Sequence, residues 1–293
     1  MEKLVLDKMN KFLFHNNMIS IVARPTYWSR ARYHGQQAYL QRVSTRIRGE
    51  EVAEHLGFKL NPQVREIDEV CIFIKPRHLT SVKDGDYVDV LDDVRVIPRL
   101  KERPKVKVIA ISEVHYNYLK KELSNEITLI PHHHINFERS KRRKNKTLTG
   151  GIIGTPSHMV HDITKKIKDG LAEVGIEFTT CFDFKTRQDM VEYYKKIDFL
   201  VIWYLDIYKR DSFYRHPAKI INAASFGIPS LGQPILGYSE VEGLYIPIES
   251  VEDIMREAQR LKDENYYNQW SHKLLKEAEK YHISNISKLY QKL

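Results

Sequence analysis

The feature that most constrains the fold is a regular alternation of short apolar runs and longer segments with helical character. Apolar runs such as MISIVA at 18–23, EVCIFIK at 69–75 and DFLVIW at 198–203 have the length and composition of buried strands. Between such runs, segments such as 45–58 and 186–196 are expected to form helices. This alternation is typical of parallel sheets that are covered by helices on both faces.

The other elements are predicted from the same alternation. Further strands are expected at 87–93, 105–112, 126–131, 176–182, 228–233 and 244–248. Further helices are expected at 113–124, 217–226, 250–263 and over most of 265–293. A strand that ends in glycine, a loop and a long amphipathic helix are expected within 149–175.

The alternation is interrupted near residue 145 by the basic stretch RSKRRKNK at 139–146. A chain of 293 residues is long enough for two domains of about 150 residues each. We therefore predict an α/β protein with two Rossmann-like domains facing across a cleft. The N-terminal domain is expected at 1–145, with the basic stretch as a linker at its end, and the C-terminal domain at 146–272. Because open parallel sheets bind ligands at the carboxyl ends of their strands, the cleft is the expected site.

The charge of the chain favours an anionic partner. The net charge is +9, from 47 basic and 38 acidic residues. The basic stretch at 139–146 has no interleaved aromatic residues, and blocks of like charge usually extend and repel, which favours a solvated linker. Contact of this stretch with nucleic acid or anionic lipid is the alternative.

Several features indicate a cytoplasmic protein. No apolar run approaches the ~18–20 residues that a membrane span needs. The first residues, MEKLVLDKMNKFLFHNN, do not resemble a signal peptide, because charged residues precede any apolar run. Cys71 and Cys181 lie in or beside strand-like runs and are interpreted as buried thiols in a reducing compartment. Peripheral contact with a membrane stays open.

The three consecutive histidines His132, His133 and His134 invite a metal site. Adjacent residues on a strand point to opposite faces, so the three cannot all bind one ion without a loop. No further cysteine or His-x-x-His pair lies at a useful spacing. We therefore expect a role in a hinge loop and predict no metal.

A glycine-rich segment, GGIIGTPSH at 150–158, follows the first strand of the second half. Glycines after a buried strand let a phosphate or sugar approach the backbone at the start of a helix. Gly150, Gly151 and Gly154 do not have the spacing of a G-x-G-x-x-G fingerprint, and the chain has no Walker motif. A binding loop and a plain tight turn are both compatible with this segment.

The segment RHPAKIINAASFGIP at 215–229 places basic residues before a helix of small and apolar residues. Arg215 and Lys219 therefore lie where free N–H groups and the helix dipole favour an anion. The segment resembles a recurrent element of GT-B glycosyltransferases, in which a basic residue precedes a small-residue helix that ends in Gly-x-Pro. The matching positions are Pro217, Lys219, Asn222, Ala223, Gly227, Ile228 and Pro229.

Two other segments support the same resemblance. VSTRIRGEEVAEHLG at 43–57 is similar to the family's Ser-x-Arg-x-Arg-Gly motif, which faces the acceptor side. LIPHHHINFE at 129–138 is similar to the strand end before the interdomain linker. The resemblance covers most of 40–290, and it implies that the final helix, 273–293, packs back on the N-terminal domain.

The resemblance implies a glycosyltransferase that transfers a sugar from a nucleotide-diphosphate sugar to a hydroxyl acceptor, which is a glycan, a lipid-linked molecule or another alcohol. Basic side chains would replace a metal at the leaving diphosphate, so no cofactor is expected. The donor site is expected at Gly154, Thr155, Trp203, Tyr204, Arg215, His216, Lys219 and Asn222. The acceptor site is expected at Ser44, Arg46, Arg48 and His115.

The chain departs from the family at one expected pair. Many retaining members carry two glutamates at the positions of Tyr214 and Asn222, so retention or inversion of the sugar stays open. His34 is the first candidate for a general base, because imidazole titrates near neutrality, and Glu113 is the second. The alternative function is a non-catalytic protein on the same scaffold that binds a sugar, a nucleotide or a polyanion; nucleic acid is the least favoured partner.

Overall fold

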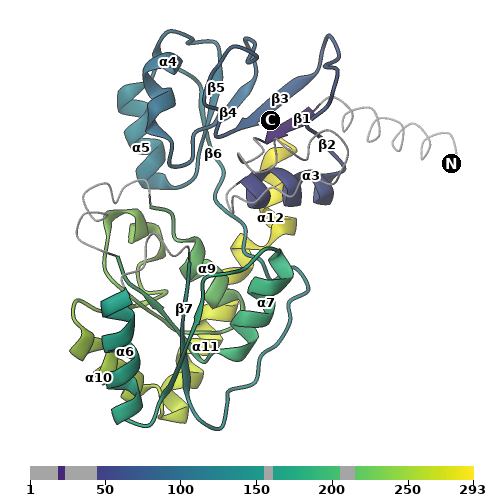
Figure 1. The fold of residues 1–293 in the computed structure, drawn as a ribbon. Coiled ribbons are helices and arrows are strands. Elements are labelled where there is room, and N and C mark those ends of the chain that lie inside the picture. Colours follow the sequence, from purple (N-terminus) through teal and green to yellow (C-terminus); the bar gives the residue numbers. More distant parts are fainter. Residues whose placement is uncertain (1–18, 24–44, 155–160, 205–214) are drawn as a thin grey trace, which may run out of the picture. The chain divides into compact units, whose positions relative to one another are not determined.

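The computed structural model describes residues 19–23, 45–154, 161–204 and 215–293 (Figure 1). The chain divides into two compact units. Unit 1 comprises Met1–His132 together with Ser287–Leu293, and unit 2 comprises His133–Ile286. These bounds differ from the predicted division near residues 145 and 272, because the basic stretch at 139–146 and most of the C-terminal helices belong to unit 2.

Unit 1 contains a parallel sheet with the strand order β2-β1-β3-β4-β5-β6. Its described strands are β1 (Ile19–Ala23), β2 (Lys59–Leu60), β3 (Val70–Ile74), β4 (Tyr87–Asp89), β5 (Lys107–Ala110) and β6 (Ile127–Leu129). Its described helices are a π-helical turn η1 (Arg46–Glu50), α3 (Glu51–Leu56), a short 3₁₀ turn η2 (Val94–Val96), α4 (Ile97–Lys101) and α5 (Glu113–Glu122).

Strands β3 and β5, inside this sheet, are apolar on both faces, which is why their sequences are largely continuous apolar runs rather than alternating ones. Phe73, Val88 and Val108 pack in the cluster that α4 and α5 cover. Their neighbours Ile72 and Ile109 have no exposed surface either. Both sides of the sheet are therefore buried at these strands, whereas the edge strand β2 is exposed.

The helix expected at 45–58 begins as the π-helical turn η1, in which Gly49 lies against strand β1. A Cβ atom at Gly49 would stand 2.6 Å from the Cβ of Ala23, which is too close for any other residue. The helix then continues as α3 and ends at Gly57, whose φ of 70° is left-handed. The Arg-x-Arg-Gly motif thus contains one residue that packing demands.

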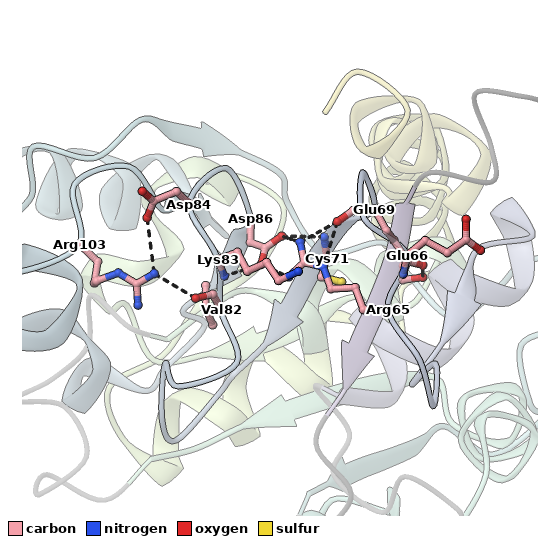
Figure 2. Close-up of polar contacts among 10 residues, drawn as sticks. Arg65, Glu66, Glu69, Cys71, Val82, Lys83, Asp84, Asp86 and Arg103 are labelled. Atoms are coloured by element: carbon pink, nitrogen blue, oxygen red, sulfur yellow. Dashed lines mark hydrogen bonds and ion pairs between the residues drawn. The ribbon is translucent and has the colours of Figure 1, made fainter.

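A polar network fixes the loop before β3 to the loop before β4 (Figure 2). Arg65 donates to both carboxylate oxygens of Asp86 at 2.7 and 2.5 Å, and to the carbonyl oxygen of Glu69 at 3.0 and 2.6 Å. Asp86 also accepts from the backbone N–H groups of Cys71 at 3.0 Å and Lys83 at 2.7 Å. The network closes the amino ends of the two strands, away from the edge where ligands bind.

Unit 2 contains a second parallel sheet, with the strand order β11-β10-β9-β7-β8. Its described strands are β7 (Thr149–Ile153), β8 (Glu177–Cys181), β9 (Phe199–Ile202), β10 (Ser230–Gly232) and β11 (Ile246–Pro247). Its described helices are α6 (His161–Glu173), α7 (Arg187–Lys196), α9 (Ala218–Ser225), η5 (Leu236–Val241), α10 (Val251–Arg260), α11 (Glu264–Ala278), η6 (Glu279–Tyr281) and α12 (Ile283–Tyr290), whose last residues belong to unit 1.

Helices cover both faces of this sheet, as the pattern predicts (Figure 1). Leu200 and Ile202 of β9 pack in one cluster with side chains of α7, α9 and α11. Phe199 and Val201 point to the other face, where α6 and α10 lie. Alternate residues of β9 therefore pack in two separate cores, one on each face of the sheet. The expected α/β class with two Rossmann-like units is confirmed.

The basic stretch at 139–146, called the basic strap below, exposes Arg139, Lys141, Arg143 and Lys146, as expected of a solvated linker, but it is anchored to unit 2 at Arg142. The Arg142 side chain is only 3% exposed and forms an ion pair with Asp198 at 2.5 Å. Asp198 also accepts from the backbone N–H groups of Asn145 at 2.9 Å and Thr149 at 2.8 Å. The strap is therefore fixed to unit 2 through one buried carboxylate.

The C-terminal segment is helical, as expected, with a break between α11 and α12 at His282, whose backbone is extended. The last seven residues belong to unit 1. There the Tyr290 ring centroid lies 5.7 Å from the guanidinium carbon of Arg48, and Tyr87 donates to the carbonyl oxygen of Leu293 at 3.2 Å. Among the helices described, none is long and apolar enough to cross a membrane.

The two cysteines differ in their surroundings. Cys71 is buried in β3, and burial raises the pKa of its thiol to about 11. Cys181, at the end of β8, is half-buried, so the expectation of two buried thiols is confirmed for Cys71 alone. Both thiols are free.

Candidate functional site

The candidate site lies at the carboxyl edge of the sheet in unit 2. The chain leaves β7 toward β8 on one side, and β9, β10 and β11 continue on the other side. Ligands of open parallel sheets bind at such a reversal of strand order. Gly154 follows β7 directly, and Trp203 and Tyr204 follow β9, so three expected residues lie at this point.

Tyr204 is held in place by groups that follow the neighbouring strand. Its backbone N–H donates to Oε1 of Gln233 at 2.6 Å, and its hydroxyl lies 2.9 Å from the hydroxyl of Tyr238. The N–H of Gln233 in turn donates to the carbonyl oxygen of Ile202 at 3.3 Å. The ends of β9 and β10 are thereby tied together, which fixes the position of the Tyr204 ring.

Two cations face the ring of Tyr204. The guanidinium carbon of Arg215 lies 5.4 Å from the ring centroid, and Nζ of Lys219 lies 5.6 Å from it. Both distances are within the range of a cation–π contact. Lys219 is in the first turn of α9, and the preceding Pro217 has no polar side chain to cap that turn. The edge therefore combines two positive charges with a helix start, an arrangement that attracts anions.

The hydroxyl of Tyr204 meets a second phenol, that of Tyr238. Tyr238 is buried, and burial, followed by the neighbouring Tyr204, raises the pKa of Tyr238 well above its usual value. Its ring also packs edge-on against that of Tyr245, with centroids 5.8 Å apart. The Tyr238 hydroxyl is therefore uncharged at physiological pH.

The adjacent aromatic residues Trp203 and Tyr204 serve opposite sides of the sheet. Trp203 is partly buried against the cluster that α6 and α10 cover. Tyr204 packs against the opposite cluster and faces the cations. Of the two interpretations open for these rings, core packing describes Trp203, and Tyr204 is the one available to a ligand. His216 is half-buried beside Arg215.

Asn222, one turn after Lys219 on α9, makes its contacts within unit 2. Its side-chain oxygen accepts from the backbone N–H of Ile135 at 3.1 Å, and a further hydrogen bond joins its side chain to Tyr194. The residue is 6% exposed. Its amide fixes the segment after the histidines to α9, so the site described here does not include it.

The two arginines expected at an acceptor are both buried. Arg48 is 1% exposed, forms an ion pair with Asp89, and donates to the carbonyl oxygen of Pro131 at 3.0 Å. Burial acts to lower the pKa of Arg48, but the charge of Asp89, the neighbouring Tyr290 and the hydrogen bond to Asp89 together outweigh it, so the pKa is raised. Arg46 is 7% exposed, and its Nε lies 3.6 Å from Glu51. Both guanidinium groups stabilise unit 1, so neither enters the site that we propose.

The two expected residues after β5 differ in exposure. Ser112 caps α5 by accepting from the N–H of His115 at 3.1 Å. Glu113, in the first turn of α5, is exposed. The His115 ring has no exposed surface, and its Nδ1 accepts from the N–H of Ile111 at 3.4 Å. Glu113 is thus the accessible titratable group at this end of β5, and His115 packs inside.

Some expected residues cannot be placed. His34, Ser44, Thr155 and Tyr214 lie outside the described residues. Their predicted roles at the acceptor, the donor or in catalysis stay predictions.

The three histidines lie where the chain passes from unit 1 to unit 2, and all three are buried. The N–H of His134 donates to the carbonyl oxygen of Tyr281 at 2.9 Å, and its Nδ1 accepts from the N–H of Asn136 at 3.2 Å. Burial, together with His282 and His133, lowers the pKa of His134 to about 3. No group of three or more His, Cys, Asp or Glu in the described part of the chain is placed to hold a metal ion.

Two residues of the site were missed by the sequence reasoning. Gln233 and Tyr238 hold Tyr204, yet neither belongs to the motif at 215–229. The available signal is positional: Gln233 follows a buried strand, at the edge where ligands bind.

Comparison with known proteins identifies the fold. No protein-family model matches the chain, and neither does any curated protein. Among solved structures, TarM is similar, with a TM-score of 0.55 and 12% identity. The match covers 77% of this chain and 54% of the TarM chain. WaaG, a glycosyltransferase involved in lipopolysaccharide biosynthesis, is similar with a TM-score of 0.53 and 10% identity, covering 83% and 79%.

The GtfA/B complex contains a chain with a TM-score of 0.52 and 11% identity, covering 76% of this chain and 56% of its own. The chain therefore spans little more than half the length of two of these three structures. At such identities the likeness concerns the fold, and it shows that the chain has the GT-B glycosyltransferase fold.

Proposed function

We propose that the protein is a glycosyltransferase that transfers a sugar from a nucleotide-diphosphate sugar to a hydroxyl acceptor. The observation that carries the proposal is the position of Arg215 and Lys219, at 5.4 and 5.6 Å from the ring of Tyr204. This pair stands at the carboxyl edge of unit 2, beside the reversal of strand order between β7 and β9. A nucleotide-diphosphate sugar carries a negatively charged diphosphate, and Arg215 and Lys219 supply positive charge that would bind it.

The electrostatics of the site suit a departing diphosphate. Cleavage of the bond between sugar and diphosphate leaves negative charge on the phosphate oxygens. Fixed positive groups stabilise that charge more than they stabilise the intact donor, which lowers the barrier. Arg215, Lys219 and the start of α9 would supply this stabilisation without a metal.

The neighbouring groups suit the rest of the donor. The ring of Tyr204 is fixed by Gln233 and Tyr238 and offers a flat face to a sugar or base. Gly154 follows β7 and lets a ligand approach the backbone there. On unit 1, Glu113 is exposed at the start of α5 and is the described candidate for the base that takes the acceptor's proton.

A second function, binding of a nucleotide or sugar without transfer, is favoured by one observation. The position at which retaining family members carry a glutamate holds Asn222, whose amide is bonded to Ile135 and buried. No carboxylate at this position reaches a ligand. A protein of this kind would bind the donor and leave it intact.

Calorimetric titration with UDP, GDP, ADP, CMP and dTDP tests the proposal, first with EDTA and then with Mg²⁺. We expect one diphosphate to bind without metal, and Arg215→Gln and Lys219→Gln to weaken it about tenfold each, the effect of one hydrogen bond to a charged group. Lys165→Gln, on the exposed side of α6, is the matched control and leaves affinity unchanged.

A second experiment separates transfer of the sugar from binding alone. Incubation with the matching sugar nucleotide, followed by measurement of released diphosphate with and without candidate alcohols, distinguishes transfer from binding alone. Binding without release supports the second function. Absence of binding by every nucleotide, or equal loss in the Lys165→Gln control, contradicts a donor site at this edge.

A further inference from the structure

A hollow of about 360 Å³ lies in unit 2 between the basic strap and α11. Its size is within the range of pockets that hold small molecules. Four basic side chains of the strap line it, and Glu279 is the acidic residue of its lining. These basic residues are Arg139, Lys141, Arg142 and Lys144.

The hollow is separate from the site at Tyr204. Lys219 is in the first turn of α9, whereas Ser225, the last residue of this helix, lines the hollow. With a rise of about 1.5 Å per residue, an eight-residue helix separates its two ends by roughly 12 Å. The proposed nucleotide site does not account for the hollow.

The wall formed by the strap is held rigidly. The side-chain oxygen of Asn136 accepts from the N–H of Ser140 at 2.7 Å, and its nitrogen donates to the carbonyl oxygen of Ser225 at 2.8 Å. Arg139 binds Glu279 through two hydrogen bonds, at 2.6 and 3.1 Å. The strap backbone at Ser140 and the Arg139 side chain are therefore held in place before any ligand arrives, which reduces the entropy that binding costs.

The hollow carries uncompensated positive charge. Arg142 is paired with Asp198, but its Nε is buried and has no hydrogen-bond partner among the described residues. Lys144 Nζ contacts neutral groups, the carbonyl oxygen of Leu261 at 3.3 Å and the ring of Tyr267 at 4.6 Å. A buried donor without an acceptor and an ammonium without a carboxylate are both satisfied by an anion.

The opposite wall is apolar with polar groups beside it. Phe226 is buried, and Leu275 of α11 is 44% exposed although it is a large apolar side chain. Ser271, one turn earlier on the same helix, adds a hydroxyl to the lining. We propose that this hollow binds a phosphate monoester, with the phosphate at Lys141, Lys144 and Arg142 and an apolar or planar body against Phe226 and Leu275.

The proposal is tested by titration of the full chain with phenyl phosphate, which carries both parts of the expected ligand. Inorganic phosphate and phenol are the probes for each part alone. We expect phenyl phosphate to bind more tightly than either. The double substitution Lys141→Gln with Lys144→Gln is expected to weaken this binding about a hundredfold, since each lost charged hydrogen bond is worth about tenfold.

A matched pair of substitutions controls for overall charge. Arg143 and Lys146 belong to the same strap, are exposed and do not line the hollow. Arg143→Gln with Lys146→Gln removes the same two charges and is expected to leave affinity unchanged. Equal weakening by both pairs overturns the proposal, because attraction would then be general. Lys219→Gln is expected to leave this binding intact, which separates it from the nucleotide site.

Two sources of the phosphate are distinguished by a second arm with vesicles of phosphatidylcholine that contain phosphatidic acid. Binding of phenyl phosphate in solution without vesicle binding indicates a free metabolite, and vesicle binding with the same dependence on Lys141 and Lys144 indicates a lipid headgroup. Leu275→Glu, at an exposed position, places a carboxylate in the hollow and is expected to abolish both. Binding to neither probe, or binding that Leu275→Glu leaves intact, overturns the proposal.

Discussion

Arg142 donates from Nη1 to Oδ1 of Asp198 at 2.5 Å, and neither side chain is more than 3% exposed. The other oxygen of this carboxylate accepts from Nδ2 of Asn145 at 3.0 Å and from the N–H of Thr149 at 2.8 Å. Tyr267 adds a bond from its hydroxyl to the backbone carbonyl of Asp198 at 2.9 Å. Asp198, directly before β9, thus joins the basic strap and β7 through its carboxylate and α11 through its backbone carbonyl.

Asp198→Asn is expected to lower the free energy of unfolding of unit 2 by about 3 kcal/mol or more, because removing one partner leaves a buried charge uncompensated. Urea unfolding followed by circular dichroism measures this. Glu192→Gln, which breaks an exposed pair with Lys195, is the control and costs less than about 0.5 kcal/mol. A loss as small as that of the control would show that Asp198 does not hold the strap.

Gly49→Ala is expected to destabilise unit 1 by about 1–3 kcal/mol, because the added methyl group would stand against Ala23. Thermal unfolding measures the loss. The double substitution Gly49→Ala with Ala23→Gly moves the methyl group across the contact and is expected to recover part of it. No recovery would mean that the clash lies elsewhere.

Burial holds the pKa of His134 at about 3, below its usual 6.5, with His282 and His133 adding to the effect. The unfolded chain therefore binds a proton that the folded chain does not. The resulting stability is complete above about pH 6.5 and is lost as the pH falls toward about 3, by about 1.4 kcal/mol per pH unit.

Urea unfolding at a series of pH values measures this dependence. His134→Gln is expected to flatten the slope between about pH 6 and pH 4, the window that the two pKa values define. His272→Gln, at an exposed position on α11, is the control and keeps the slope of the parent protein. An unchanged slope in His134→Gln would assign the dependence to other groups.

Two substitutions at Tyr204 separate the ring from its hydroxyl. Tyr204→Phe keeps the ring beside Arg215 and Lys219 and loses the bond to Tyr238, so affinity for the nucleotide diphosphate is expected to fall about two- to fivefold. Tyr204→Ala also loses the face that the cations contact and is expected to cost about tenfold or more. Calorimetry measures both; equal affinities in the two variants would exclude a role for the ring.

The sheets could be predicted from sequence because parallel strands buried on both faces leave continuous apolar runs. The lengths of the individual strands could not be predicted in this way. The strand expected at 87–93 ends as β4 at Asp89, whose carboxylate turns to Arg48, and Leu91 has a left-handed φ of 53°. The apolar run shows where the strand lies. The residue at which the strand ends depends also on contacts with side chains distant in the sequence, such as that of Asp89 with Arg48.

The site could be predicted in part for a related reason. Arg215 and Lys219 belong to a local motif at a helix start, so their position follows from nearby sequence. Whether a polar side chain points outward depends on partners that a motif does not contain. Asn222 is bonded to a backbone N–H 87 positions away, and Gln233 and Tyr238 reach Tyr204 from beyond the next strand.

The return of Ser287–Leu293 to unit 1 has a consequence for biosynthesis. A ribosome makes nearly all of unit 1 first, yet Tyr290, which covers the buried Arg48, emerges only after the whole of unit 2. At about 5–20 residues per second, the delay is on the order of ten seconds. During that time the Arg48–Asp89 pair lacks its aromatic cover, so unit 1, most of which is translated before unit 2, is completed after it.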